Sequence, residues 1–541
     1  MKRRLGPPEV ARKSVFRPPK ALRGIFHAVL PRSAAPIAGA SRIDPSIESR
    51  AAPMGGAPAG SDTQDRTPAQ RRIGLLVLGL LFIASHASLF YGQFTGEDEA
   101  LQWHACRRII MAFSEHGPIQ ALRAIANILL TEYHPPLRYL LSLPGVWFIP
   151  RLEVGTRLGA ILGSAWMTFL LSRIALKLGG ARAAWITAFV VAASGVYVWT
   201  SMAFAWGWLT VLVCAAVLLL WEPETLDLSR PGAMPRLWLA FCCLFGAYLV
   251  NSGAILFSVG LVLLLLSRHY RRLPQLILLG LPVAFMYGLY WAVFFLLPEH
   301  PGQLAQTARR FGMGGWNLNA LVENLRGWNA YGFPLVFNLL WMAGLVVCFQ
   351  QRRHLLWILL PFSLAWSFWL QGQSHQYFLL GTLPLLPWGL HAARHLLRGT
   401  LRPAFLIVAV YVWNLSLFQI PYPAKLGRIE AARPWIAIGL GYAGRWHNAR
   451  EPWRKIARDL EAAVARGESW WSDLNGPFGI FYFPGEPGRR WTTSRYPKDP
   501  EAPRVWWILS DKYTSTAGHE VRTYEGSRLV LIRVGPTEPI P

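Results

Sequence analysis

The chain has 541 residues, of which 53% are hydrophobic, with 26 Trp, 28 Phe and a formal net charge of +25. Apolar runs of roughly 15–25 residues alternate with short basic segments, which excludes an ordinary soluble protein and is typical of a polytopic membrane protein. The positive charge does not indicate nucleic-acid binding, because Arg and Lys collect in loops and in the N-terminal segment, without a basic helix or an aromatic platform for RNA.

The cysteine pattern excludes two further classes. Four of the five cysteines fall inside apolar runs, and Cys106 alone lies outside them. The sequence contains no CxxC pair and no Cys/His spacing of the kind found in zinc sites. We therefore expect neither a disulfide framework nor a structural zinc site.

Residues 1–72 are predicted to be a disordered, basic cytoplasmic tail. They are rich in Ala, Pro, Gly, Ser and Arg, a composition too polar for a packed core. The basic start is not followed directly by an apolar stretch, so the pattern does not predict a signal peptide. Gly24-Ile25-Phe26 is a weaker candidate for an anchor at the membrane surface.

Residues 73–420 are predicted to form an α-helical transmembrane domain of about eleven spans. The expected spans are about 73–91, 157–178, 183–199, 204–221, 237–250, 253–267, 273–297, 333–350, 355–371, 377–392 and 403–420. Residues 92–156 and 298–332 are then two long loops on the outer side of the membrane.

The positive-inside rule sets the orientation of these spans. The basic clusters that this assignment places in the cytoplasm are Arg173/Lys177/Arg182, Arg268/Arg271/Arg272, Arg352/Arg353 and Arg394/Arg398/Arg402. Loop 222–236 is an exception, because its acids outnumber its basic residues. Counting Pro135–Pro150 as a span would move most of the clusters outside, so we do not count it. We expect a bacterial inner-membrane protein with a cytoplasmic N-terminus and an extracytoplasmic C-terminus.

The first outer loop is predicted to contain two amphipathic helices that lie on the bilayer surface. Apolar residues of the first recur every four positions, opposite a polar face; they are Leu101, Ala105, Ile109 and Phe113, and the polar residues are Gln102, Arg107 and Arg108. A second apolar stripe follows through Ile119, Leu122, Ile125, Ala126 and Leu129.

Residues 446–541 are predicted to form a small extracytoplasmic α/β domain. Trp453 to Arg466 has a helical period, and short β-like runs follow at about 479–483, 505–510 and 529–534.

The first outer loop begins with three successive acids, Glu97, Asp98 and Glu99, in a chain with only 29 Asp and Glu against 54 Lys and Arg. Sugar transfer from a lipid-linked donor needs a carboxylate to take the proton of the acceptor hydroxyl as it attacks the anomeric carbon. It also needs cations to stabilise the charge on the departing lipid phosphate. No phosphate-binding glycine motif of a nucleotide site is present. The alternative is that the acids cap the surface helix, which is favourable by about 0.5–2 kcal/mol.

Several short segments, taken in order, resemble the GT-C glycosyltransferases, in particular the family-39-like bacterial enzymes related to protein O-mannosyltransferases and to the lipid A aminoarabinose transferase. These segments are Asp98-Glu99-Ala100, His134-Pro135-Pro136-Leu137, Arg157-Leu158, Tyr377-Phe378-Leu379-Leu380 before Pro384-Leu385-Leu386-Pro387, and Trp453-Arg454-Lys455-Ile456-Ala457. The resemblance extends from residue 73 to about 510 and is sharpest over 73–200.

The resemblance implies a GT-C fold and inverting transfer of a sugar from a polyprenyl-phosphate donor to a lipid, glycan or protein acceptor. Asp98 would be the general base and Glu99 its support, with Glu97 as base if the register shifts by one. The candidate substrate-binding residues are His134, Arg138, Arg157, His375 and Tyr377. A helix cap at His134 and snorkelling at the two arginines are the structural alternatives.

One feature departs from the family pattern. Relatives often carry an acid or an Arg near the outer turn between the third and fourth spans, whereas residues 197–204 here carry no charge. A single cluster of adjacent acids does not make a coordination shell. We therefore assign no metal-ligating residues and no certain cofactor; a divalent metal stays an open alternative without support in the sequence.

Two other functions fit parts of the pattern. A transporter or flippase of lipid-linked glycans should carry ionisable residues or broken helices at the middle of the bilayer. A protein like an O-antigen ligase or polymerase would hold its key residues in a late outer loop, where Arg309, Arg310 and Arg326 lie. A non-catalytic scaffold is a further alternative, and the transferase is the leading interpretation.

Overall fold

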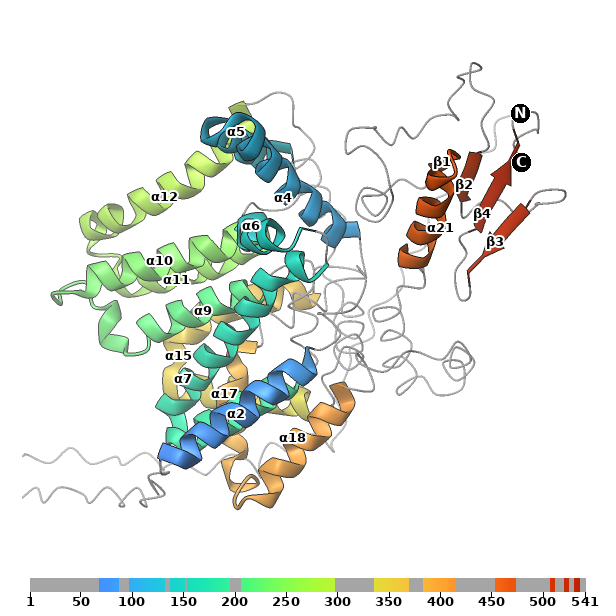
Figure 1. The fold of residues 1–541 in the computed structure, drawn as a ribbon. Helices are drawn as coiled ribbons and strands as arrows, with labels where there is room; N and C mark the ends of the chain where they lie inside the picture. Colours follow the sequence, from blue (N-terminus) through green and yellow to red (C-terminus); the bar gives the residue numbers. More distant parts are fainter. Residues whose placement is uncertain are drawn as a thin grey trace, which may run out of the picture. The chain divides into compact units, whose positions relative to one another are not determined.

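The computed structural model describes residues 68–86, 97–131, 137–150, 153–194, 206–296, 335–368, 383–414, 453–472, 506–510, 520–524 and 530–535. These residues form a mostly helical structure with a small sheet near the C-terminal end of the sequence (Figure 1). Residues 1–67 of the predicted tail (1–72) lie outside the described residues.

The apolar segments form a bundle of helices. Its described members are α2 (Pro68–Ser85), α7 (Glu153–Ala193), α9 (Trp206–Leu219), α10 (Ala233–Val250), α11 (Ile255–His269), α12 (Leu273–Leu296), α15 (Leu335–Phe368), α17 (Leu386–Ala392) and α18 (Leu401–Asn414). Helices α2, α7 and α10 are long and apolar enough to cross a bilayer, and α9, α11, α12 and α18 contain shorter apolar segments. Helix α2 starts before the predicted residue 73.

Helices α7 and α15 each contain two predicted spans joined by a break. In α7 the break is at Gly179 and Gly180, and Gly180 has a positive φ of 74°, a conformation that glycine adopts without steric cost. In α15 the backbone leaves the helical region at Arg352. Both breaks fall within or beside basic clusters, where the sequence predicts cytoplasmic turns.

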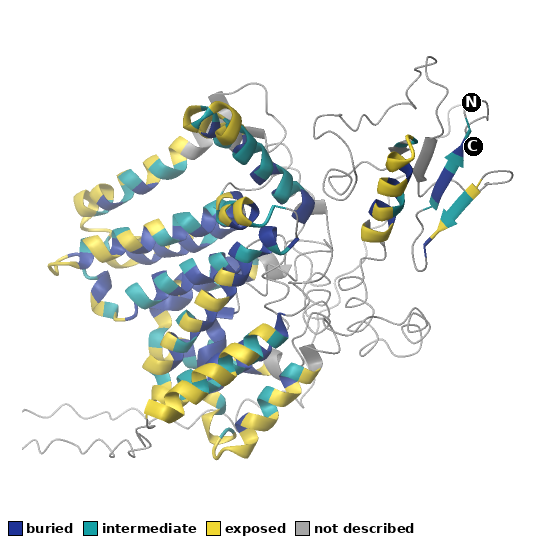
Figure 2. Cartoon of the chain, viewed as in Figure 1, coloured by how far each residue is buried: buried dark blue, intermediate teal, exposed yellow. Residues whose placement is uncertain are grey.

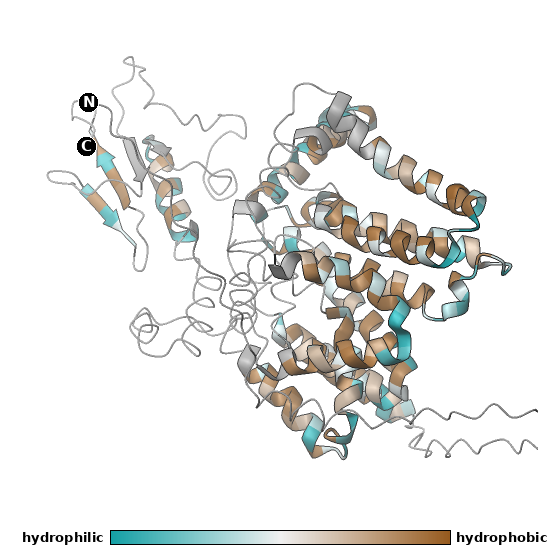
Figure 3. Ribbon diagram, turned by 180° about the vertical axis from the view of Figure 1, so that it is seen from behind, coloured by the Kyte–Doolittle hydropathy of each residue, from teal (hydrophilic) through white to brown (hydrophobic). Residues whose placement is uncertain are grey.

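The surface of the bundle is as apolar as its centre. Large hydrophobic side chains on α2, α12 and α18 are exposed, including Leu76, Phe285 and Phe405 (Figures 2 and 3). Buried residues of α7, α9, α10, α11, α15 and α17 form one continuous core. Contiguous exposed apolar faces around such a core are what helices surrounded by lipid present.

Three further helices precede α7: α4 (Glu97–His116), α5 (Pro118–Thr131) and α6 (Leu137–Phe148). Gly117, with a φ of 79°, separates α4 from α5. Helix α6 has 12 residues, or about 18 Å of helix, which is shorter than the roughly 30 Å hydrocarbon core of a bilayer. The exclusion of 135–150 from the spans stays a prediction.

One predicted position on α4 needs correction. Gln102 is buried, not on a polar outer face, because its amide finds hydrogen-bond partners inside the protein. On α5, Ile119 and Leu122 are 68% and 65% exposed, whereas Ala121 and Ile128 face the protein core. An exposed apolar stripe of this kind is what a helix lying on a bilayer surface presents to the lipid, and that placement stays a prediction.

Near the C-terminus, α21 (Trp453–Ala465) precedes a four-stranded sheet. The strands are β1 (Ser469–Ser472), β2 (Trp506–Ser510), β3 (Glu520–Thr523) and β4 (Val530–Val534), in the order β1-β2-β4-β3. Strands β1 and β2 are parallel, and the other two pairs are antiparallel. The predicted helix and the runs at 505–510 and 529–534 are present, β1 and β3 were not predicted, and 479–483 is outside the described residues.

Helices α6 and α7 pack closely because small residues line their contact. A side chain at Gly159 would collide with the backbone carbonyl oxygen of Leu141, and one at Gly155 would collide with that of Ile149. Backbone atoms cannot move aside as a flexible side chain can. Glycines at these two positions therefore set the distance between α6 and the first turns of α7.

We predict that Gly159→Ala destabilises the protein by about 1–3 kcal/mol, as overpacking of a close contact does. Gly79→Ala on α2 is the matched control, because no atom lies within 4 Å of the added Cβ. The control should be neutral or slightly stabilising. Thermal unfolding of both variants in detergent checks this prediction, and equal midpoints would contradict it.

Candidate active site

A buried ion pair joins the start of α4 to the first turns of α7. The Arg157 guanidinium donates from Nε to Oε1 of Glu99 at 2.7 Å and from Nη2 to Oε2 at 2.9 Å. The side chains are 2% and 1% exposed. This paired geometry satisfies both oxygens of the carboxylate and gives the strongest form of charged hydrogen bond.

Further contacts fix α4 against α6 along the same helical face. The Gln102 amide donates to the Arg138 carbonyl oxygen at 3.2 Å and to the Ser142 hydroxyl. One turn later, the Cys106 thiol donates to the Tyr139 carbonyl oxygen at 3.3 Å, and burial raises the pKa of this thiol. Residues 99, 102 and 106 share one face of a helix by their spacing. This face therefore holds the acidic first turn of α4 in place.

Arg138 is the second buried arginine of this region. Its side chain is 1% exposed, and its guanidinium lies 5.1 Å from the centre of the Tyr139 ring. Arg138 is the second residue of α6 and is four residues after His134 in the sequence. A buried guanidinium has the charge needed to bind a phosphate group.

A second ion pair lies one turn before Arg157 on α7. The guanidinium of Arg454, from α21, binds both carboxylate oxygens of Glu153 at 3.0 and 2.7 Å. Glu153 is buried and Arg454 is half exposed. Glu153 and Arg157 are four residues apart and therefore lie on the same face of α7. The beginning of α7 thus binds both α4 and α21 through charged pairs.

The structure describes three of the seven predicted site residues in full. Glu99 and Arg157 form the buried ion pair, and Arg138 lies on α6, where its carbonyl oxygen accepts a hydrogen bond from Gln102. The backbone of Asp98 lies in the first turn of α4, while its side chain is outside the described residues. His134, His375 and Tyr377 are outside them too, as are the alternative candidates Arg309, Arg310 and Arg326.

Sequence reasoning missed Gln102 and Glu153. Gln102 lies in a stripe with Ala105 and Ile109, and this i, i+3, i+7 spacing was the available signal. Glu153 is an isolated acid just before a predicted span, which carries no information about a partner 301 residues away. Among the described residues, no group of three or more His, Cys, Asp or Glu side chains could hold a metal ion.

The fold has matches among solved structures. The structure resembles two crystal structures of ArnT from Cupriavidus metallidurans, a lipid A aminoarabinose transferase of GT-C type. The apo structure matches with a TM-score of 0.52 at 14% identity. The structure bound to undecaprenyl phosphate matches with a TM-score of 0.55 at 15% identity. Each match covers 86% of this chain and 98% of ArnT.

No family model and no curated protein matches the sequence. The likeness at this identity is a likeness of fold. It confirms the predicted GT-C resemblance and a mostly helical membrane architecture.

We predict that Glu99→Gln destabilises the fold by about 3–5 kcal/mol, because it leaves the Arg157 charge buried without its counter-ion. The control Glu115→Gln removes a carboxylate from the same helix at a 55% exposed side chain and should change stability by at most about 0.5 kcal/mol. Both stabilities are measured by heating each purified variant in detergent and recording the fraction of protein that stays folded.

A double variant distinguishes the cost of leaving one buried charge unpaired from the cost of losing the ion pair itself. Glu99→Met/Arg157→Met should be more stable than Glu99→Gln, because it removes both charges together. If Glu99→Gln is as stable as Glu115→Gln, the ion pair does not hold α4.

Proposed function

We propose that the chain is an inverting glycosyltransferase that moves a sugar from a polyprenyl-phosphate donor to a lipid, glycan or protein acceptor. The observation that carries this proposal is the GT-C fold, shared with an ArnT structure that has undecaprenyl phosphate bound. The first turn of α4 supports the proposal, because the buried pair of Glu99 with Arg157 anchors to α7 the backbone that carries Asp98.

In the proposed reaction Asp98 is the general base. Its carboxylate takes the proton of the acceptor hydroxyl while the oxygen attacks the anomeric carbon of the donor sugar. The bond from that carbon to the phosphate oxygen breaks, and the polyprenyl phosphate leaves with the electron pair. A single displacement of this kind inverts the anomeric centre.

The other predicted residues receive roles that follow from their surroundings. Arg138, buried in α6, is proposed to stabilise the charge on the leaving phosphate. Glu99 is proposed to act through Arg157, holding the turn that carries Asp98, because both donors of the observed pair already bind its carboxylate. His134, His375 and Tyr377 keep their predicted role as substrate contacts.

The distribution of charge favours this proposal over transport. In the described helices α2, α9, α10, α11 and α12, Arg, Lys, Asp and Glu occur only near the ends, whereas a transporter needs ionisable groups at mid-membrane. An activity like that of an O-antigen ligase is distinguished by its product, since it would transfer a whole glycan rather than one sugar. Mass spectrometry of lipopolysaccharide, lipid and glycoprotein fractions with and without the gene identifies the product and the acceptor.

We predict that Asp98→Asn lowers sugar transfer by at least about 100-fold, the lower range for loss of a general base, while expression and membrane insertion stay normal. Glu115→Gln, farther along α4, is the control and should keep full activity. Transfer is measured by incorporation of labelled sugar in membranes that express each variant. Full activity of Asp98→Asn would exclude the proposed mechanism.

The proposed outer-face reaction also fixes the orientation of the chain. Two reporters are fused after Pro541 in separate experiments. Alkaline phosphatase, which is active only in the periplasm, should be active, and a reporter that is active only in the cytoplasm should be inactive. A cytoplasmic reporter that is active at this position would contradict the proposed topology.

A further inference from the structure

A second polar site lies at the opposite end of the bundle from the Glu99–Arg157 pair. It is a cavity of about 430 Å³ between the end of α11, the turn after α9 and the break in α15. Its lining includes Arg268, Arg353, His354, Gln350 and Phe349. This volume is within the range of about 300–1,000 Å³ that ligand pockets occupy.

Contacts along α7 establish the position of this cavity. Lys177 is twenty residues after Arg157 on the same helix, which corresponds to roughly 30 Å, about the thickness of the hydrocarbon core. The Lys177 ammonium lies 5.8 Å from the centre of the Trp221 ring, and the Arg352 guanidinium lies 5.4 Å from it. The cavity is therefore at the end of the bundle that carries the basic clusters, predicted to be cytoplasmic.

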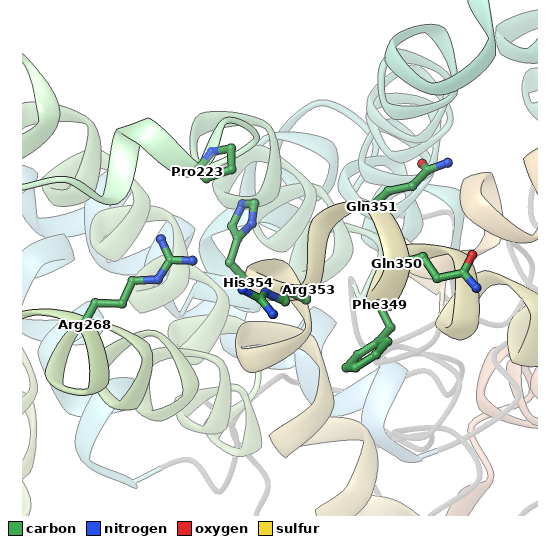
Figure 4. A pocket seen from close by; sticks show the side chains of 7 residues that line it. All are labelled: Pro223, Arg268, Phe349, Gln350, Gln351, Arg353 and His354. Carbon is green, nitrogen blue, oxygen red and sulfur yellow. The ribbon is translucent and has the colours of Figure 1, made fainter. Parts of the chain in front are cut away.

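The cavity is positively charged. Figure 4 shows Arg268 on one side, and Arg353 and His354 on the other. Arg268 and Arg353 line the same cavity from different helices, α11 and α15. Within the described part of the chain, neither guanidinium has an ion pair with a carboxylate; the nearby Glu222 binds Arg352 instead, at 3.4 Å.

Basic side chains next to Arg268 and Arg353, by contrast, have partners within the protein. Arg272 pairs with Asp227 at 3.6 Å, and His354 uses its Nε2 in a hydrogen bond of 2.9 Å with the Leu220 carbonyl oxygen. Two guanidiniums that face one cavity without an acidic partner gain most from an anion placed between them. Phe349, exposed beside them, offers an apolar surface at the same place.

We propose that this cavity binds the phosphate group of an anionic phospholipid of the adjacent leaflet, with Arg268 and Arg353 as its ligands. Basic pockets between membrane helices on the cytoplasmic side bind such head groups. The two guanidiniums hold the phosphate oxygens, and an acyl chain runs along Phe349 and the apolar surfaces of α11 and α15. The site is separate from the proposed transfer reaction and does not depend on it.

The test measures lipid binding by the full chain in detergent. The midpoint of thermal unfolding is recorded at increasing concentrations of short-chain phosphatidylglycerol. A ligand that binds the folded state raises this midpoint by an amount that depends on its affinity. Short-chain phosphatidylcholine and inorganic phosphate are titrated in parallel. We expect phosphatidylglycerol to bind at least about tenfold more tightly than either.

The decisive variant is Arg268→Gln/Arg353→Gln, which should weaken phosphatidylglycerol binding by at least about tenfold. Its matched control is Arg398→Gln/Arg402→Gln, which removes two exposed arginines from the same predicted face and should weaken binding by less than about twofold. If the double variant does not fold, Arg268→Gln and Arg353→Gln are measured singly, and each should bind more weakly than the control.

Three results would overturn the proposal. If the pocket variant and the control lost affinity for phosphatidylglycerol equally, the charged lipid would be bound by the basic surface as a whole and not by the cavity. Equal binding of phosphatidylcholine would exclude selection of an anion. Inorganic phosphate that binds as tightly as phosphatidylglycerol would make the site one for a free anion and not for a lipid. None of these results depends on sugar transfer.

Discussion

The buried pair of Glu99 and Arg157 is the interaction on which the placement of helix α4 depends. An amphipathic helix the length of α4 has little stability of its own in water, and its apolar side alone would let it slide over the bundle. The two hydrogen bonds to Arg157, at 2.7 and 2.9 Å, define both the position and the rotation of its first turn. Gln102 and Cys106 extend the same contact along α6. A general base requires such placement, because proton transfer demands hydrogen-bond distance to the acceptor.

The two ends of the bundle use charge in different ways. At the end that holds α4, the described carboxylates of Glu99 and Glu153 are buried and each binds an arginine in a bidentate pair. At the other end, roughly 30 Å along α7, Arg268 and Arg353 face a cavity without an acidic partner in the described chain. The first arrangement rigidifies the protein around the first turn of α4, where the proposed base lies. The second leaves cationic charge available to an anion, which is the condition for a binding site.

Much of the fold could be predicted because a bilayer imposes simple rules. Backbone groups in lipid must bond within a helix, so long apolar runs identified the helical segments of α7, α10 and α15, and basic clusters marked where the chain turns. The prediction was weaker for helix α4, whose two sides face different surroundings. There Gln102 was assigned to the polar side, although it is buried against α6.

The amino-acid sequence by itself determined the class of protein, the helical segments and the three acids that begin α4, because hydropathy and order along the chain carry that information. It also supported the resemblance to GT-C enzymes, which the fold comparison confirms. Only the tertiary structure decided the partners. Glu99 and Arg157 are 58 residues apart, and Glu153 and Arg454 are 301 apart. No local pattern encodes such pairs, since they arise only when α4 and α21 pack against the beginning of α7 and bring distant side chains together.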